Sequence, residues 1–272
     1  MISRAELQRL ANREKVALGT LEKDYVLTEV LKALSRVPEL SELFIFKGGT
    51  ALRKVFFSGW RYSEDLDFTV RRDMAKEELR ETLEKWYRQA EQMSQIQLAT
   101  RMLHKPDGYA RVRAQFIGPL SFPGMIFMDL SFDEPLCLEP QHRKVLTSPF
   151  PDEEQYHVLS YPLEELLAEK MRSLVERGKS RDYYDVWRLL KRQSDEIDPR
   201  LLGTVLLKKL SHKGLNVHDT NDFLPVDIDE LKRYWEDDLG RQISPLPQLD
   251  EVMRELRDML DKSVAPHLVF QA

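Results

Sequence analysis

The chain has 272 residues, a formal net charge of −5 and a single cysteine, Cys137. One cysteine excludes a disulfide-stapled fold and a cysteine-rich zinc site, and the acidic balance excludes a globally basic nucleic-acid-binding protein. No apolar run is long enough to span a bilayer, and the first residues lack the basic-then-apolar profile of a secretory signal. We therefore expect a cytoplasmic protein with no membrane partner.

The first part of the chain mixes two kinds of hydrophobic spacing. Apolar residues recur every three or four positions in some segments and alternate, or form short runs, in others. The predicted helices lie at residues 3–37, 51–57 and 74–94, and the predicted strands at 44–46, 65–70, 110–117 and 125–132. Gly-Pro and Pro-Gly steps between the last two strands indicate a hairpin-like connection.

The second part of the chain has helical spacing almost throughout. Its predicted helices are 163–177, 182–193, 198–211, 227–239 and 248–262. Residues 135–160 have no clear period, so we predict a domain boundary there. The expected organisation is a domain of residues 1–155 holding the N-terminal helices and the strands, then a helical domain of residues 156–272. The expected fold class is α+β.

A Gly-Gly turn followed by two alternating aspartates carries the chemical signal. Asp65 and Asp67 are two apart on a strand and therefore share one face, where their charges repel unless a cation such as Mg²⁺ or Mn²⁺ lies between them. Gly48 and Gly49 allow close approach of a phosphate to the backbone. Singly, the aspartates are more often a solvated edge and the glycines only a turn. Together they fit phosphoryl or nucleotidyl transfer from an NTP.

A third carboxylate is expected from another strand. Asp129 lies inside an apolar strand, where a carboxylate must be hydrogen-bonded or metal-bound. Asp133 is the alternative, although a turn at the strand end explains it without chemistry. We favour Asp129 as the third metal ligand.

A local basic cluster lies between residues 165 and 192, with eight Lys or Arg against five Asp or Glu. Lys170 would contact the triphosphate. Three cations of the following turn would hold phosphates of nucleotide or RNA; they are Arg177, Lys179 and Arg181. The alternative is structural: Asp182 complements a helix dipole, and residues 181 and 185 form an ordinary ion pair.

Two further segments lie close to these motifs. Residues 22–25 are Glu-Lys-Asp-Tyr, which could edge an active site, but a charged helix face is the simpler interpretation. Ser63 stands two residues before Asp65. We hypothesise that Ser63 lies at the nucleotide site and that its phosphorylation, which adds about −1.5 to −2 charges, blocks triphosphate binding.

The motifs together resemble the AbiEii/AbiGii-type toxins of the nucleotidyltransferase superfamily. The segments that carry the likeness are 46–53, 61–68, 169–172 and 180–186, with weaker likeness at 21–25 and 234–239. The resemblance implies a polymerase-β-like nucleotidyltransferase core, a mixed sheet with helices, and a helical C-terminal domain. It also implies nucleotide transfer, in characterised members to the 3′ end of tRNA, and a cognate antitoxin.

The resemblance also implies roles for individual residues. Gly48, Gly49 and Thr50 would hold phosphate, Arg53 would support the nucleotide site, Lys170 would bind nucleotide, and Asp182, or else Asp185, would act in catalysis. Fifteen residues separate Gly49 from Asp65. One shared site therefore requires residues 51–62 to fold as a helix and a loop.

The leading hypothesis is a Mg²⁺-dependent nucleotidyltransferase that acts as the toxin of a toxin–antitoxin system. Asp65 and Asp67 would hold metal, and Asp129 or Asp182 would orient or deprotonate the attacking hydroxyl. One alternative keeps this chemistry with a small molecule or a protein hydroxyl as acceptor. Another is a non-catalytic nucleotide-binding module.

Overall fold

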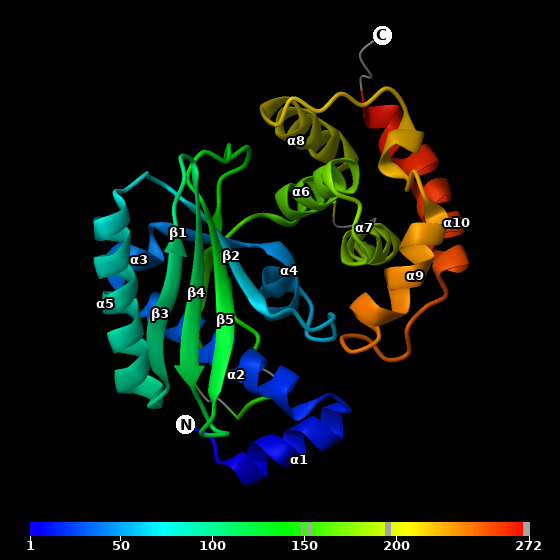
Figure 1. Ribbon diagram of the computed structural model, residues 1–272. Helices are drawn as coiled ribbons and strands as arrows, with labels where there is room; N and C mark the ends of the chain where they lie inside the picture. The colour runs from blue at the N-terminus through cyan, green and yellow to red at the C-terminus, as the bar shows by residue number, and fades with distance from the viewer. Residues whose placement is uncertain (148, 152–153, 194–196, 269–272) are drawn as a thin grey trace. The chain divides into compact units, whose positions relative to one another are not determined.

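The computed structural model describes residues 1–147, 149–151, 154–193 and 197–268, which form two compact units (Figure 1). The first unit contains Met1–Glu134 and Pro140–Tyr161. The second contains Pro135–Glu139 and the chain from Pro162 onward. Tyr161 thus ends the first unit, a little beyond the boundary that we predicted after residue 155. Because the short segment Pro135–Glu139 belongs to the second unit, the chain passes between the units three times.

A seven-stranded mixed sheet forms the centre of the first unit, with strand order β3-β4-β5-β2-β1-β7-β6. The pairs β2–β5 and β1–β7 are parallel, and the other neighbours are antiparallel. The strands are β1 Phe44–Lys47, β2 Asp65–Val70, β3 Gln97–His104, β4 Tyr109–Ile117, β5 Pro123–Ser131, β6 Gln141–Lys144 and β7 His157–Ser160. The predicted α+β class and the hairpin between β4 and β5 are confirmed.

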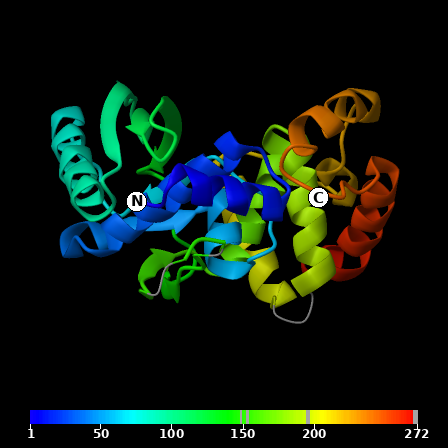
Figure 2. The ribbon, with the colours of Figure 1, turned by 90° about the horizontal axis from the view of Figure 1, so that it is seen from below.

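Helices cover one face of this sheet and enclose the core. They are α1 Arg4–Glu14, α2 Leu18–Ser35, α3 Pro38–Ser41 and α5 Lys76–Ser94. Trp86 of α5 is fully buried against Phe44 and Phe68 of the sheet, and its indole N–H donates to the Val30 carbonyl of α2 over 2.8 Å. Figure 2 shows α1 and α2, in blue, lying beside one another. Buried aromatic rings therefore join the sheet to α5 and α2.

The second unit is helical, as predicted. Its helices are α6 Leu163–Glu176, α7 Ser180–Gln193, α8 Pro199–His212, α9 Ile228–Leu239 and α10 Leu249–Met259, with short helical turns at Thr220–Phe223, Leu260–Val264 and Ala265–His267. Each long helix turns an apolar stripe inward, as the spacing of the sequence indicates. Among the described residues, no helix combines the length and the apolar character that crossing a membrane would require.

The segment Pro135–Glu139 is held in the second unit by a buried ion pair. The Glu165 carboxylate accepts the backbone N–H groups of Cys137 and Leu138, each over 2.9 Å. Lys209 donates to the Pro135 carbonyl over 2.7 Å and lies 2.9 Å from Glu165 Oε1, and both charged side chains are fully buried. These buried charges satisfy one another and fix the short segment against α6 and α8.

Candidate active site

The Gly-Gly turn and the aspartate strand come together in the first unit. Strand β1 ends at Lys47 and leads directly into the turn of α4, Gly48–Ala51, which continues as a π-helical turn, Leu52–Phe56. The hydroxyl of Thr50 donates to the Asp65 carbonyl over 2.5 Å. Gly48 has φ +79°, and a Cβ there would lie 2.6 Å from Asp67 Cγ. The helix and loop expected between the two motifs are therefore confirmed, and only glycine leaves room for the Asp67 carboxylate.

Three aspartates share one face of two neighbouring strands. In β2, Leu66 and Phe68 are fully buried, while Asp65 and Asp67 point to the other side and are partly exposed. Strand β5 runs parallel to β2 with Asp67 directly opposite Asp129. Residues in register point to the same face, so the structure brings Asp129 to the pair. Asp133 lies beyond the end of β5, packed against Gly108.

Asp129 has two polar neighbours on β4. The hydroxyl of Tyr109 donates a short hydrogen bond to Asp129 Oδ1, and Arg111 Nε lies 3.6 Å from the same oxygen. Burial raises the pKa of the Tyr109 hydroxyl well above its usual range, and the hydrogen bond to Asp129 adds to the effect. Tyr109 therefore remains a proton donor at neutral pH and orients the carboxylate.

The donor set fits a hard divalent cation. Carboxylate oxygens are the ligands that Mg²⁺ and Mn²⁺ prefer, and all three aspartates are partly exposed on the same face. The space left by the missing Cβ of Gly48 is taken by the Asp67 carboxylate, which ties this ligand to the turn. In the part of the chain that the structure describes, no three His, Cys, Asp or Glu side chains form a ready-made metal cluster. Asp65, Asp67 and Asp129 offer the oxygen ligands that such an ion prefers, and their assignment as metal ligands stays a prediction.

Arg61 and Ser63 lie over the second glycine of the turn. A Cβ at Gly49 would meet Arg61 Nη2 at 2.9 Å and Ser63 Oγ at 3.2 Å. Arg61 is 3% exposed, and its guanidinium also donates to the Tyr62 carbonyl over 3.2 Å. A phosphate approaching Gly49 would meet a cation and a hydroxyl. Ser63 was predicted to lie at the nucleotide site, whereas Arg61 was given no role, although its place four residues before Asp65 was a usable signal.

Arg53 is committed to contacts within the fold. Its side chain is 6% exposed, with Nε 3.2 Å from Asp24 Oδ1 and Nη1 donating to the Trp60 carbonyl over 2.6 Å. Its guanidinium also stacks 3.6 Å from the centre of the Tyr62 ring. This geometry fits a residue that positions the loop before Asp65, and it leaves little of the guanidinium for a nucleotide.

The Glu-Lys-Asp segment of α2 contacts three other segments of the first unit. Asp24 is 1% exposed and lies 2.8 Å from Lys54 Nζ, in addition to its contact with Arg53. Lys23 forms an ion pair with Glu64, next to Asp65, and Glu22 accepts the Leu120 N–H over 2.8 Å. The interpretation of this segment as a charged helix face is therefore wrong for Asp24. The signal was weak because a buried ion pair and a surface charge look alike in a sequence.

The second unit assembles the other predicted charges around Lys170. Its Nζ lies 3.0 Å from Asp185 Oδ2 and 3.6 Å from Asp182 Oδ1, and Arg177 binds both oxygens of Asp182, over 2.9 and 3.0 Å. Both aspartates are fully buried. Although burial opposes it, the positive charges of Lys170 and Arg177 lower the pKa of the Asp182 carboxyl. Lys170 and Asp182 are thus neutralised within the unit.

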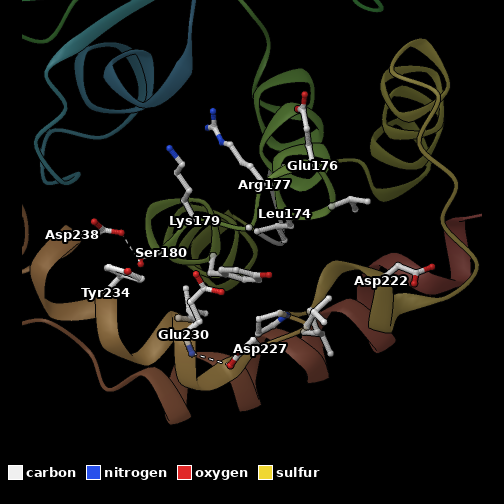
Figure 3. A pocket seen from close by; sticks show the side chains of 17 residues that line it. Leu174, Glu176, Arg177, Lys179, Ser180, Asp222, Asp227, Glu230, Tyr234 and Asp238 are labelled. Carbon is white, nitrogen blue, oxygen red and sulfur yellow. Dashed lines mark hydrogen bonds between the residues drawn. The ribbon is translucent and has the colours of Figure 1, made fainter.

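Two of the three predicted RNA contacts, Arg177 and Lys179, line a pocket of about 700 Å³ whose opposite wall is acidic (Figure 3). Arg177 and Lys179 line one side, and the Ser180 hydroxyl donates to Asp238 of α9 over 2.9 Å. Further carboxylates of this wall are Asp222, Asp227 and Glu230. Arg181 is half-buried and is not among the lining residues. The carboxylates of this wall therefore balance the net positive charge of residues 165–192.

Comparisons with known proteins agree with this geometry. The family model described as "Nucleotidyl transferase AbiEii toxin, Type IV TA system" matches residues 30–262. Among solved structures, the chain is similar to MenT4, a nucleotidyltransferase toxin from Mycobacterium tuberculosis H37Rv, with a TM-score of 0.67 and 19% sequence identity. The likeness covers 95% of this chain and 88% of that one, and at this identity it shows the fold. No curated protein matches the chain.

Proposed function

This chain belongs to the AbiEii nucleotidyl transferase toxins of type IV toxin–antitoxin systems, and we propose that it transfers a nucleoside monophosphate from an NTP to tRNA. Membership in the family makes it a nucleotidyltransferase and implies an antitoxin partner. The proposal adds the acceptor, the 3′ hydroxyl of tRNA, and Mg²⁺ or Mn²⁺ as the metal. It also places the reaction in the cytoplasm, where both substrates occur.

The observation that carries the proposal is the contact between the Gly48 turn and the row of aspartates. Asp65, Asp67 and Asp129 would hold the metal, since they share one face and offer only oxygen ligands. When bound, the metal would screen the triphosphate charge and polarise the α-phosphate. The Asp67 carboxylate lies against Gly48, and Arg61 and Ser63 lie against Gly49, so the turn brings a metal ligand and two phosphate-binding side chains to the same point.

The chain's own residues would position the two reactants. Arg61 and Ser63, above Gly49, would bind phosphate oxygens of the NTP. The acceptor hydroxyl would then attack the α-phosphorus and lose its proton to a nearby carboxylate, forming one P–O bond while the bond to pyrophosphate breaks. Asp129 is a stronger candidate than Asp182 for orienting that hydroxyl. It lies beside Asp67 on the neighbouring strand, and Tyr109 fixes one of its oxygens.

The assignment of tRNA as the acceptor rests on the resemblance to the family. Lys170, Asp182 and Asp185 support the reaction less directly, since their charges are compensated by one another and by Arg177. We propose that this buried cluster shapes the helical unit, because only 11% of the Lys170 side chain is accessible and its Nζ is paired with Asp182 and Asp185.

Label transfer tests the proposal directly. Each of the four α-³²P-labelled NTPs is incubated with total tRNA and Mg²⁺, using wild type, Asp65→Ala, Asp67→Ala and Asp129→Asn, with Asp133→Asn as the matched control. We expect label on tRNA with one or two of the NTPs, lost in the first three variants and kept in the control. Turnover retained in Asp65→Ala or Asp67→Ala would remove the metal assignment.

Two other results would redirect the proposal. Pyrophosphate release with cell extract, but no label on RNA, would indicate a small molecule or a protein hydroxyl as acceptor. Nucleotide binding that raises the melting temperature without any pyrophosphate release would indicate a non-catalytic module.

A further inference from the structure

Strands β2, β5, β4 and β3 present a polar face on the side of the sheet opposite the core. In β4, Ala110, Val112 and Ala114 are fully buried, while the intervening Arg111 and Arg113 are exposed. In β5 the same alternation buries Met128 and leaves its neighbours partly exposed. The side chains that alternate outward belong to the face that carries the catalytic aspartates.

The register of the strands aligns this face into rows that begin at the aspartates. Residues in register stand side by side about 5 Å apart. One row runs Asp67, Asp129, Arg111, His104, and the next runs Asp65, Phe127, Arg113, Met102. Each row thus starts at a predicted metal ligand on β2 and reaches an arginine on β4. The arginines stand two strands, or about 10 Å, away from Asp65 and Asp67.

Positive charge and an aromatic ring are combined on this face. The side chain of Arg111 is 46% exposed, and its guanidinium lies 5.2 Å from the centre of the Phe127 ring. A third arginine, Arg101, lies at the bulge between Thr100 and Met102 and donates to the Gln115 side chain. Arg101, Arg113 and Met102 are exposed. We call Arg101, Arg111, Arg113 and Phe127 the arginine platform.

Single-stranded RNA is the ligand that this chemistry fits best. Arginines bind phosphates, and an aromatic ring set between them offers a stacking surface for a base. A flat sheet face accommodates unpaired nucleotides without having to read a duplex groove. The basic turn at Arg177 and Lys179 is a poorer candidate, because acidic residues form the opposite wall of its pocket.

We propose that the arginine platform binds the single-stranded 3′ end of the RNA acceptor. This inference rests on the proposed function, since it assumes that the acceptor is RNA. The terminal hydroxyl lies at Asp65, Asp67 and Asp129. The nucleotides that precede it cross β5 and β4, with one base on Phe127 and phosphates at the arginines. The rows of the sheet thereby direct the strand end to the reacting phosphate.

Direct binding of RNA, without turnover, tests the platform. The probe is a 5′-fluorescein single-stranded RNA of about 12 nucleotides with a free 3′ hydroxyl, within the usual site sizes of single-strand binders. Its anisotropy is followed with wild type, Arg101→Glu/Arg113→Glu and the control Arg80→Glu/Arg88→Glu, whose exposed arginines lie on α5. Arg111 is left intact because it contacts Asp129.

We expect the platform variant to bind the RNA at least about 30-fold more weakly and the control to bind as wild type does. The slope of log K against log salt should fall by about 1.4, or about 0.7 for each of two lost phosphate contacts. The variant Arg101→Gln/Arg113→Gln removes the two charges without reversing them, and it replaces the glutamate variant if that variant does not fold. It should also bind the RNA more weakly than wild type. Phe127→Leu should weaken binding about 5- to 100-fold through lost stacking, with an unchanged salt slope.

Equal RNA binding by the platform variant and the control would overturn the inference. A second result would also overturn it: the platform variant loses binding to an acidic protein but keeps the RNA affinity of wild type. The face would then be a protein-docking surface. Binding of an NTP to each variant separates this failure from that of the proposed function. Normal NTP binding with unaltered RNA affinity removes only the platform, whereas transfer to a non-RNA acceptor removes the RNA proposal as well.

Discussion

Replacing Gly48 by alanine should inactivate the enzyme by displacing Asp67. At φ +79° an alanine is destabilised by about 1–2 kcal/mol relative to an ordinary conformation. Alanine also lowers the entropy of the unfolded chain, but the stabilisation from this effect is smaller than the strain. The new methyl group would lie 2.6 Å from Asp67 Cγ and 2.8 Å from its Cβ. Relieving that overlap requires Asp67 to move by about 1 Å, a displacement that typically lowers the rate about 100-fold.

Two other glycines separate backbone strain from this contact. Gly214 also has positive φ, +64°, but a Cβ there meets nothing within 4 Å. Gly19 has no positive φ and equally open surroundings. Urea unfolding should show a loss of about 1 kcal/mol for Gly214→Ala, at least as much for Gly48→Ala, and none for Gly19→Ala.

Only Gly48→Ala should lose label transfer, by about 100-fold or more. Because the stability losses of Gly48→Ala and Gly214→Ala are similar in origin, unfolding alone does not account for a difference in activity. Wild-type activity in a folded Gly48→Ala protein would refute the reasoning. Asp67 would then either tolerate the displacement or have no part in the reaction.

Three further changes address other parts of the molecule. Asp24→Asn should lower the free energy of unfolding by about 3–5 kcal/mol, since it leaves two buried cations without their partner; exposed Asp73→Asn is the control, and a loss below about 1 kcal/mol contradicts the prediction. Because its pKa is lowered in the folded protein, Asp182 stabilises the fold fully above about pH 5 and loses this effect as pH falls below about 4. The difference in stability between wild type and Asp182→Asn, measured by urea unfolding, should therefore narrow toward low pH; a constant difference would count against it. Ser63→Glu should weaken NTP binding at least about tenfold while Ser58→Glu, exposed in the same loop, leaves it unchanged; equal affinities would reject the phosphorylation hypothesis.

Strong periodicity made most of the elements predictable from the sequence. The long helices and β2 have alternation or three-to-four spacing that survives in the fold. Strand β3 was not predicted, because only Leu103 of its eight residues is buried and the polar face leaves no apolar pattern. Strand β6, Gln-His-Arg-Lys, is an edge strand with no buried residue. Strands with so little buried surface give no hydrophobic signal.

The arrangement of the candidate site was predictable where its residues are neighbours in the sequence. Alternation in residues 65–70 was enough to put Asp65 and Asp67 on one face. The pairing of Asp67 with Asp129 depends on a parallel register between distant strands, and the burial of Asp24 depends on Arg53 and Lys54 from a separate helix. These contacts join residues that are far apart in the sequence and form only in the tertiary structure, so no local sequence pattern predicts them.

The short segment Pro135–Glu139 also has a consequence for the order in which the protein is made. During synthesis, the segment leaves the ribosome before any helix of its own unit, so Glu165 and Lys209 are not yet there to bind it. The sheet is also incomplete at that moment, because β6 and β7 follow. Neither unit can therefore finish folding on the ribosome from one uninterrupted stretch of chain. The contacts that hold Pro135–Glu139 are completed only when α8, which carries Lys209, has emerged, after most of the chain has been translated.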